Sequence, residues 1–429
     1  MLATEEQKLL ACVHCGLCLE ACPTYTFTND ENDSPRGRIY LMRAVVEEKL
    51  PEDSATFRTH IDRCLGCRAC EPVCPAGVEY GQLLEASRAT LYSKTPRGFN
   101  YRLLSFVLRR VWLHPARLRF AFGFARLLRN SGLAQLLLQS RIARLFSQRF
   151  EFGLGLLVSS APQVGTDSDP SASAPSNDRL RAAALLFTGC VTEGLFARVN
   201  EATKRVLLVN GVQTEAPGKQ VCCGALHAHA GDLDGARVLA RQNIAAFESA
   251  DVPVVTNAGG CGAMLVSYAH LLADDAEFAD RARKFASRVK DVSQQLEEGA
   301  IKTGASVGGV VTYDASCHLL NGQHATEAPL KMLRAIPNLN LVTLEGAERC
   351  CGGAGVYNLL EPQMSAGVLQ EKLDHIRRTG ASVLATGNPG CQMQIGCGML
   401  LAKMDLRSCH PVELLDESYR HAGFYSKPF

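Results

Sequence analysis

The sequence predicts a multidomain α+β protein: a helical, cysteine-rich module comes first, then a basic helical segment, then two repeated α/β lobes. Three observations predict this order. Cysteines concentrate near the N-terminus, a long middle stretch lacks acidic residues, and a cysteine pattern occurs twice in the second half. The 429 residues are enough for two to four domains at about 150 residues each.

The 18 cysteines are not expected to form structural disulfides. The N-terminus, MLATEEQKLLA, lacks the basic patch and apolar core of a secretory signal. No run reaches the ~18 apolar residues of a membrane-spanning helix. We therefore expect a cytoplasmic protein, and disulfides are rare in that compartment.

The predicted N-terminal module, residues 1–87, contains the motif C-x2-C-x2-C-x3-C-P twice, as CVHCGLCLEACP and CLGCRACEPVCP. In this motif three thiolates bind one [4Fe–4S] cubane, while the fourth, at the start of a helical segment, points away and binds the other. The spacing therefore predicts two interleaved clusters. Their ligands would be Cys12, Cys15, Cys18 and Cys74 for the first, and Cys64, Cys67, Cys70 and Cys22 for the second.

Two questions about this module stay open. Two zinc sites are the alternative, although zinc is typical of paired C-x2-C hooks rather than of triplets followed by C-P. Between the motifs, Arg36 or Arg38 either donates hydrogen bonds toward the clusters or belongs to an exposed turn that opens a helix. Over about the first 85 residues the module resembles the two-cluster bacterial ferredoxins.

Residues 88–158 form the predicted basic amphipathic helical segment. From Arg88 to Phe150 there are 13 Lys and Arg and no Asp or Glu, so the rest of the chain carries a net charge of −11. Leu, Phe and Val alternate with Arg at helical spacing, with interruptions at Pro115 and Gly132. Such helices either lie on an anionic membrane surface or pack as a scaffold. No nucleic-acid motif accompanies the charge, so we expect no nucleic-acid partner.

After a predicted flexible linker at 159–180, the second half repeats itself. Three cysteine landmarks recur after 127, 128 and 130 residues, which indicates two Cys-Cys-Gly domains at 181–300 and 301–429. Runs such as VPVVTN and SVLAT alternate with helical patterns, which predicts a mainly parallel sheet in each lobe. The repeated cysteines are Cys190, Cys222, Cys223 and Cys261 in the first lobe, and Cys317, Cys350, Cys351 and Cys391 in the second.

Each repeated set could hold a further metal or iron–sulfur cluster, since adjacent thiolates bridge iron atoms more naturally than they bind one zinc ion. A redox or simply buried cysteine set is the alternative. We expect Cys261 and Cys391 at helix N-termini, where the helix dipole favours thiolate. Cys397 and Cys409 are predicted core residues. Four histidines near the motifs are predicted to be hydrogen-bonded within the fold rather than ligands: His227, His229, His318 and His324.

Together these motifs resemble the heterodisulfide-reductase-like iron–sulfur subunits, which include subunits of glycolate oxidase, lactate-utilisation and anaerobic glycerol-3-phosphate dehydrogenase complexes. The segments TGCVTEGLFARVNEAT, CCGALHAHAGD, CCGGAGVYNLLEP and HPVELLD are most similar to the glycolate oxidase subunit. The resemblance implies partner flavoproteins that carry FAD and oxidise glycolate to glyoxylate, with electrons passing to a quinone. The sequence departs from this family in one respect. The fullest family pattern ends each lobe's motif in C-x2-C, but here the second cysteine is replaced by Met264 in the first lobe and by Gln394 in the second.

We therefore expect an electron-transfer subunit of a glycolate dehydrogenase complex, with two [4Fe–4S] clusters and no FAD on this chain. The sequence has no dinucleotide fingerprint, P-loop or serine-hydrolase motif, so no catalytic residue is assigned. The alternatives are a subunit of a lactate or glycerol-3-phosphate dehydrogenase complex, or a thiol/disulfide enzyme. The acceptor is a quinone or another oxidant. Peripheral contact with the inner face of the cytoplasmic membrane is an open question.

Overall fold

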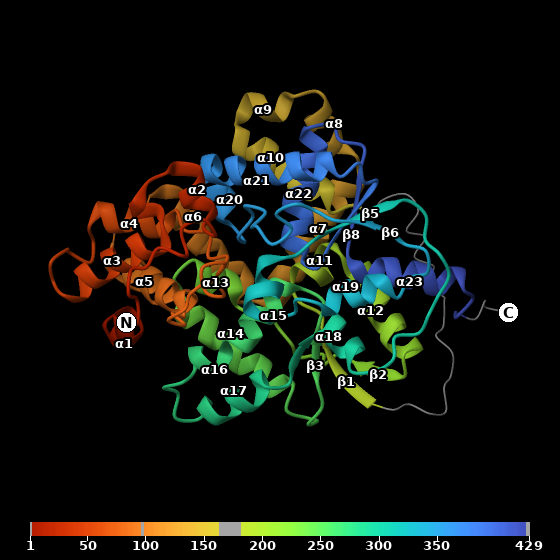
Figure 1. Ribbon diagram of the computed structural model, residues 1–429, viewed down its shortest axis with the longest axis horizontal. Helices are drawn as coiled ribbons and strands as arrows, with labels where there is room; N and C mark the ends of the chain where they lie inside the picture. The colour runs from red at the N-terminus through yellow and green to blue at the C-terminus, as the bar shows by residue number, and fades with distance from the viewer. Residues whose placement is uncertain (1, 96–97, 163–181, 426–429) are drawn as a thin grey trace.

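The computed structural model describes residues 2–95, 98–162 and 182–425 (Figure 1). The described chain combines helices with two small sheets, which confirms the predicted α+β class. Most of the predicted linker, from residue 163 onward, lies outside the described residues.

All regular elements in the described residues of the N-terminal module are helices. Its α-helices are α1 (Glu6–Leu10), α2 (Pro23–Thr28), α3 (Pro35–Val46), α4 (Ala55–Asp62) and α5 (Tyr80–Lys94). Pro23 and Pro35 occupy the first helical positions, where a missing N–H costs nothing, and the Ser34 hydroxyl accepts from the Gly37 amide (3.0 Å) to cap α3. The cysteine loops connect α1 to α2 and α4 to α5. Because α5 runs on to Lys94, we propose that the module ends there rather than at residue 87.

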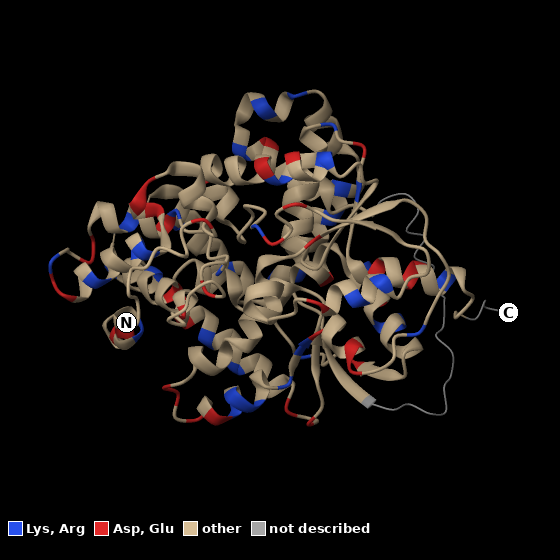
Figure 2. Ribbon diagram, viewed as in Figure 1, with Lys and Arg blue, Asp and Glu red and all other residues tan. Residues whose placement is uncertain are grey.

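The described residues of the basic segment form a series of short helices. It comprises α6 (Phe99–Val107), a π-helical turn η3 (Leu108–Trp112), α7 (Pro115–Asn130), α8 (Leu133–Gln139), α9 (Ile142–Phe146) and α10 (Gln148–Ser159). The interruptions fall as predicted: Pro115 begins α7, and Gly132, at φ +76°, separates α7 from α8. The helices α8 and α9 lie at the top of the molecule in Figure 1 and Figure 2, and of the two only α9 carries a basic residue. None of the described helices has the length and apolar character needed to cross a bilayer.

The two lobes repeat one topology. Their strands are β1 (Ala182–Phe187), β2 (Val212–Glu215), β3 (Val254–Thr256) and β4 (Val289–Asp291), then β5 (Val310–Asp314), β6 (Asn340–Val342), β7 (Val383–Thr386) and β8 (Arg407–Cys409). The strand orders are β2-β1-β3-β4 and β6-β5-β7-β8, and every pairing is parallel. The same order in both sheets confirms the internal repeat and the predicted parallel sheets.

Helices cover both sheets. In lobe 1 they are α11 (Val191–Leu195), α12 (Ala197–Val209), α13 (Ala225–His229), α14 (Leu233–Ala246), α15 (Gly259–Val266), α16 (Tyr268–Leu271), α17 (Ala279–Ala286) and α18 (Val292–Glu297). In lobe 2 they are η4 (His318–Gly322), α19 (Ala328–Arg334), α20 (Tyr357–Leu360), α21 (Pro362–Arg378), α22 (Pro389–Leu401) and α23 (Pro411–His421). One apolar core joins the lobes where α12 meets α23. The Arg205–Asp416 ion pair (2.8 Å) adds a charged contact to it.

Candidate iron–sulfur sites

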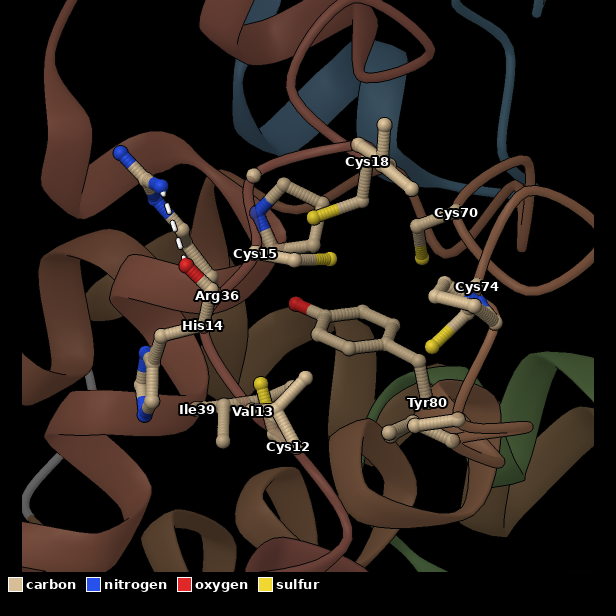
Figure 3. A pocket seen from close by; sticks show the side chains of 16 residues that line it. Cys12, Val13, His14, Cys15, Cys18, Arg36, Ile39, Cys70, Cys74 and Tyr80 are labelled. Atoms are coloured by element: carbon tan, nitrogen blue, oxygen red, sulfur yellow. Dashed lines mark hydrogen bonds between the residues drawn. The ribbon is translucent and has the colours of Figure 1, made fainter.

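The structure brings Cys74 from the second motif to the three leading cysteines of the first. One pocket is lined by the first predicted ligand set together with Cys70 and Tyr80, and the sulfur atoms gather around the Tyr80 side chain (Figure 3). The first predicted set is Cys12, Cys15, Cys18 and Cys74. Of these, Cys15 is exposed, so this site lies at the molecular surface.

Both cysteine loops adopt the same backbone conformation. The third motif position has positive φ in each, at His14 (55°) and Gly66 (64°), and so does the fifth, at Gly16 (86°) and Arg68 (61°). Left-handed residues of this kind turn backbone N–H groups toward a common anion. The Gly66 amide accordingly donates to Cys64 Sγ (3.4 Å). The loops are therefore built to surround a negatively charged group.

The spacing of the sulfurs favours clusters over the zinc alternative. In a tetrahedral zinc site with bonds of about 2.3 Å, the sulfurs lie about 3.8 Å apart. In the described residues, no three cysteine sulfurs lie within 4.8 Å of one another. A cluster keeps its thiolates further apart because iron and sulfide atoms lie between them. The cysteines therefore fit iron–sulfur clusters, although the assignment of each ligand stays a prediction.

The second predicted set gathers deeper in the module. Burial, followed by the neighbouring Cys67, Cys64 and Cys22 thiols, raises the pKa of Cys70 well above its usual value. Cys22 directly precedes α2, as the motif predicts. Cys74 differs, because a turn follows it and the next helix begins only at Tyr80. The helical start expected behind the fourth cysteine is therefore present in one motif and absent from the other.

Of the two arginines between the motifs, Arg38 is the one whose side chain donates toward a predicted cluster ligand. It is fully buried and donates to the Asp33 carboxylate (3.4 Å), the Thr24 hydroxyl (3.0 Å), the His60 carbonyl (2.6 Å) and Cys22 Sγ (3.9 Å). Burial alone would lower the pKa of Arg38, but nearby thiols and Asp33 raise it above its usual value. A permanent cation thus lies against the second site, where it stabilises negative charge.

Arg36 has a different role. Its side chain pairs with Glu31 (2.7 Å) and donates to the His14 carbonyl (3.2 Å), while its backbone amide donates to Cys18. The pair is partly exposed. Arg36 therefore holds the first loop in place mainly through backbone contacts.

Tyr80 connects the two sites and was not among the residues predicted from the sequence. Its ring lines the first pocket, and its hydroxyl donates to Cys64 Sγ (3.6 Å) of the second predicted set. The side chain is only 3% exposed. Its position at the start of α5, shortly after the second C-P, is the signal that could have identified it.

The repeated cysteines also converge within each lobe. The Sγ–Sγ distance is 3.4 Å between Cys190 and Cys222, and 4.0 Å between Cys317 and Cys350. Cys261 and Cys391 lie in the first turns of α15 and α22, as predicted. The expected thiolate is not favoured at Cys391, because a hydrogen bond with Cys351 and then burial raise its pKa well above the usual value.

Lobe 2 contacts the second site of the N-terminal module directly. A hydrogen bond with Cys350 is the largest of the effects that lower the pKa of Cys67. The His318 ring meets the Gly66 carbonyl at Nε2 (3.0 Å), and the Asn321 amide donates to the Cys67 carbonyl (2.9 Å). The cysteine sets of the module and of lobe 2 are therefore adjacent in space, although some 280 residues separate them in sequence.

Lobe 2 also places a buried cation beside its cysteines. Lys372 and Asp314 pair at 2.8 Å, and each side chain is 2% exposed. Burial lowers the pKa of Lys372, but Asp314 together with the neighbouring Cys351 and Cys350 thiols raises it above its usual value, so the amine stays charged. In lobe 1 the comparable positions are Asn243, which donates to the Cys222 carbonyl (3.0 Å), and Phe187. The two lobes therefore surround similar cysteines with different charge.

The remaining predicted residues belong to the protein interior or surface rather than to a ligand set. His227 pairs with Asp232 (2.9 Å), the His229 ring lies 5.4 Å from the His318 ring, and His324 is exposed. Burial, then the neighbouring His318, lowers the pKa of His229 well below its usual value. Cys397 and Cys409 are buried, as predicted.

The two positions at which the sequence departs from the family pattern, Met264 and Gln394, are both part of the protein interior. Gln394 is fully buried, donates to the Ser365 hydroxyl (3.0 Å) and accepts from the Asn358 amide (2.9 Å). Met264 is 4% exposed, in the core of lobe 1. Neither position provides a fifth thiolate.

Comparison with known proteins agrees with this arrangement. Residues 8–78 match the model of the 4Fe-4S dicluster domain, and residues 184–266 and 311–396 match that of the cysteine-rich domain CCG. The probable glycolate oxidase iron-sulfur subunit of Bacillus subtilis (strain 168) is 37% identical, with 97% of this chain and 95% of the relative aligned.

Two further relatives extend the comparison. The glycolate oxidase iron-sulfur subunit of Escherichia coli (strain K12) is 31% identical over 92% of this chain and 91% of the relative. The lactate utilization protein A of Oceanobacillus iheyensis is 32% identical but aligns with only 56% of this chain, and with 98% of itself. Because two relatives match along nearly the whole chain, the protein belongs to the family of glycolate oxidase iron–sulfur subunits.

Proposed function

We propose that this chain is the iron–sulfur electron-transfer subunit of a complex that oxidises glycolate to glyoxylate. The adjacency of three cysteine sets, from the first site through the second to lobe 2, is the observation that carries the proposal. When bound, [4Fe–4S] clusters supply one-electron carriers. A flavin on a partner subunit would provide the step from hydride to single electrons. The lactate alternative is not favoured, because Lactate utilization protein A aligns with only part of this chain. The disulfide alternative is not favoured, because Met264 and Gln394 replace the last cysteine of the C-x2-C pattern in the two lobes.

The first site is where we place the flavoprotein partner. Cys15 is exposed, and Val13 (69% exposed) and Leu17 (62%) flank it in the same loop. Exposed apolar side chains beside a redox site are typical of an interface with another protein. Electrons would enter at this loop and leave through the second site.

The test is an anaerobic affinity purification of the full chain with its partners, followed by EPR after addition of glycolate, lactate or glycerol 3-phosphate. We expect a co-purifying flavoprotein and cluster signals that appear with glycolate. Signals that appear only with another substrate, or a preparation without iron and sulfide, would contradict the proposal.

We further propose that lobe 2, rather than lobe 1, holds an additional iron–sulfur centre. Cys317, Cys350, Cys351 and Cys391 converge beside Cys67 of the second site and beside the charged Lys372. The cation offsets part of the negative charge of a thiolate-bound cluster. Lobe 1 has no equivalent of Lys372, and its cysteines lie next to Trp112 and Phe122 of the basic segment instead.

Cys350→Ala and its repeat counterpart Cys222→Ala form a matched pair for this assignment. We expect Cys350→Ala to lose iron and one spectroscopic signal, because it removes a ligand of the additional centre, while Cys222→Ala keeps the wild-type iron content. Iron and sulfide analysis with Mössbauer spectra measures the difference. If both variants contained as much iron as the wild type, the proposed additional centre in lobe 2 would be wrong.

We also propose that the basic segment contacts an anionic lipid surface. Exposed apolar residues recur at i, i+4 and i+7 on both α6 and α7, which is the reverse of a helix that buries its apolar face. They are Phe99, Leu103 and Phe106 on α6, and Phe120, Phe124 and Leu127 on α7. Exposed arginines accompany them, and no Asp or Glu occurs from residue 88 to 150. Interleaved apolar and cationic side chains are the pattern of an interfacial helix.

Replacing Phe120, Phe124 and Leu127 together by Ser should weaken binding to vesicles containing anionic phospholipid by at least about tenfold, since each buried apolar side chain contributes about 1.5–3 kcal/mol. Flotation of the full chain with vesicles measures the partition. The control replaces Leu400 and Leu401, which are 41% and 43% exposed on lobe 2, by Ser. Equal partitioning of both variants would assign the α7 surface to a protein partner instead.

A further inference from the structure

A cavity of about 360 Å³ lies where the module, the basic segment and both lobes meet. Arg88 reaches it from α5, Phe99 and Tyr101 from α6, His229 from lobe 1, and Val356 and Tyr357 from lobe 2. This volume falls within the range of small-ligand pockets, which is about 300–1,000 Å³. None of the predicted cluster ligands lines this cavity.

The cavity walls are tied to the second iron–sulfur site. Arg88 donates to the Cys64 carbonyl (2.6 Å), and the Tyr357 hydroxyl donates to the Arg63 carbonyl (2.7 Å). His229 packs on His318, whose ring in turn meets the carbonyl of Gly66 in the second cysteine loop. A molecule in this cavity would therefore lie one layer of side chains from the second site.

The lining combines the groups that bind a flat ring with polar edges. Three aromatic side chains and Val356 supply apolar surface. Arg88 and Arg58 supply cations, and Asp62 and Glu361 supply carboxyl groups at the edge of the lining. In the described part of the chain, neither ring nitrogen of His229 has a hydrogen-bond partner, so an imidazole N–H is available to a carbonyl oxygen. Phe99, at one side of the cavity, is 70% exposed and begins the apolar stripe of α6 that we assign to the lipid surface.

We propose that this cavity binds the electron acceptor, a lipid-soluble quinone, with its ring against the aromatic residues and its carbonyl oxygens facing His229 and Arg88. The inference rests on the proposed electron-transfer function and assigns its exit site. The quinone takes two electrons, one at a time, from the iron–sulfur relay and two protons from solvent, and it leaves as the quinol. Its isoprenoid tail would run along Phe99, Leu103 and Phe106 toward the membrane.

Val356→Trp fills the cavity, and Leu359→Trp, at an exposed position on the neighbouring turn that does not line it, is the matched control. In the assembled complex we expect Val356→Trp to reduce the rate of glycolate-driven reduction of a short-chain ubiquinone by at least about tenfold. Reduction of ferricyanide, and the cluster EPR signals that appear with glycolate, should stay at the wild-type level in both variants.

A binding measurement is made on the full chain alone. An azido-substituted short-chain benzoquinone should label peptides around residues 98–101 and 354–361, and Val356→Trp should abolish that labelling while Leu359→Trp keeps it. Labelling elsewhere, or equal quinone rates in the two tryptophan variants, would overturn the exit site. If the wild-type clusters are not reduced by glycolate at all, the proposed function fails instead, and the labelling result still decides whether the cavity binds quinone.

Discussion

Cys22→Ala should eliminate the second cluster and leave the first intact, whereas Cys74→Ala should eliminate the first. Each variant should lose about four irons per chain, because a cubane needs four thiolate ligands. Cys74 shares a pocket with Cys12, Cys15 and Cys18, although 56 residues separate it from the last of these. Quinone reduction by the complex should fall to background in both variants. Anaerobic iron analysis and EPR of each variant measure the outcome.

The pairing is tested by comparing signals. Cys22→Ala should lose the same EPR signal as Cys67→Ala, and Cys74→Ala the same signal as Cys12→Ala. Cys409→Ala, which removes a buried cysteine from β8, serves as the control and should keep both signals. If Cys22→Ala instead matches Cys12→Ala, each motif holds its own cluster and the interleaved assignment is wrong.

Arg38→Met should lower the free energy of unfolding by about 3–5 kcal/mol, which is typical when one partner of a buried ion pair is removed. The substitution leaves Asp33 fully buried with His60 (2.8 Å) and Arg63 (3.0 Å) as its remaining charged or polar partners. It also removes the cation beside Cys22, so the reduction potential of the second cluster should fall. Anaerobic denaturant unfolding and an EPR-monitored redox titration measure the two effects.

Arg36→Met is the matched control, since Arg36 lies two residues earlier and its ion pair with Glu31 is partly exposed. Exposed pairs contribute about 0–1 kcal/mol, so this variant should stay near wild-type stability. Arg38→Lys separates charge from geometry: it should be less stable because the fork of hydrogen bonds is lost, but keep the potential closer to wild type. Equal stability of Arg38→Met and Arg36→Met would show that the buried network is not important for the fold.

The sequence allowed the cofactor type, the repeat and the fold class to be predicted because these depend on local spacing. Cysteines two residues apart share one loop whatever surrounds them, and the duplicated Cys-Cys-Gly pattern implies two copies of one topology. The breaks at Pro115 and Gly132 were equally local, since both residues act on the backbone where they stand.

The buried charges near the sites were harder to predict, although each leaves a signal. Lys372 lies on the same helical face as Val368, Leu369 and Ile376, so a cation interrupts an apolar stripe. Arg38 stands among the buried residues of α3 in the same way. Helical periodicity identifies such positions as buried, but it does not identify the anion that compensates them.

The sequence by itself predicted which residues form each cysteine set, because the motifs and the repeat are local patterns. Only the tertiary structure decided which sets are neighbours: that lobe 2, not lobe 1, meets the second site through Cys350 and Cys67, and that four segments enclose a cavity around His229. The two lobes have almost the same cysteine spacing, so spacing cannot distinguish them. Their roles differ because packing places the cysteines of lobe 2, and not those of lobe 1, against the second cysteine loop of the N-terminal module. Long-range packing depends on whole surfaces rather than on any motif.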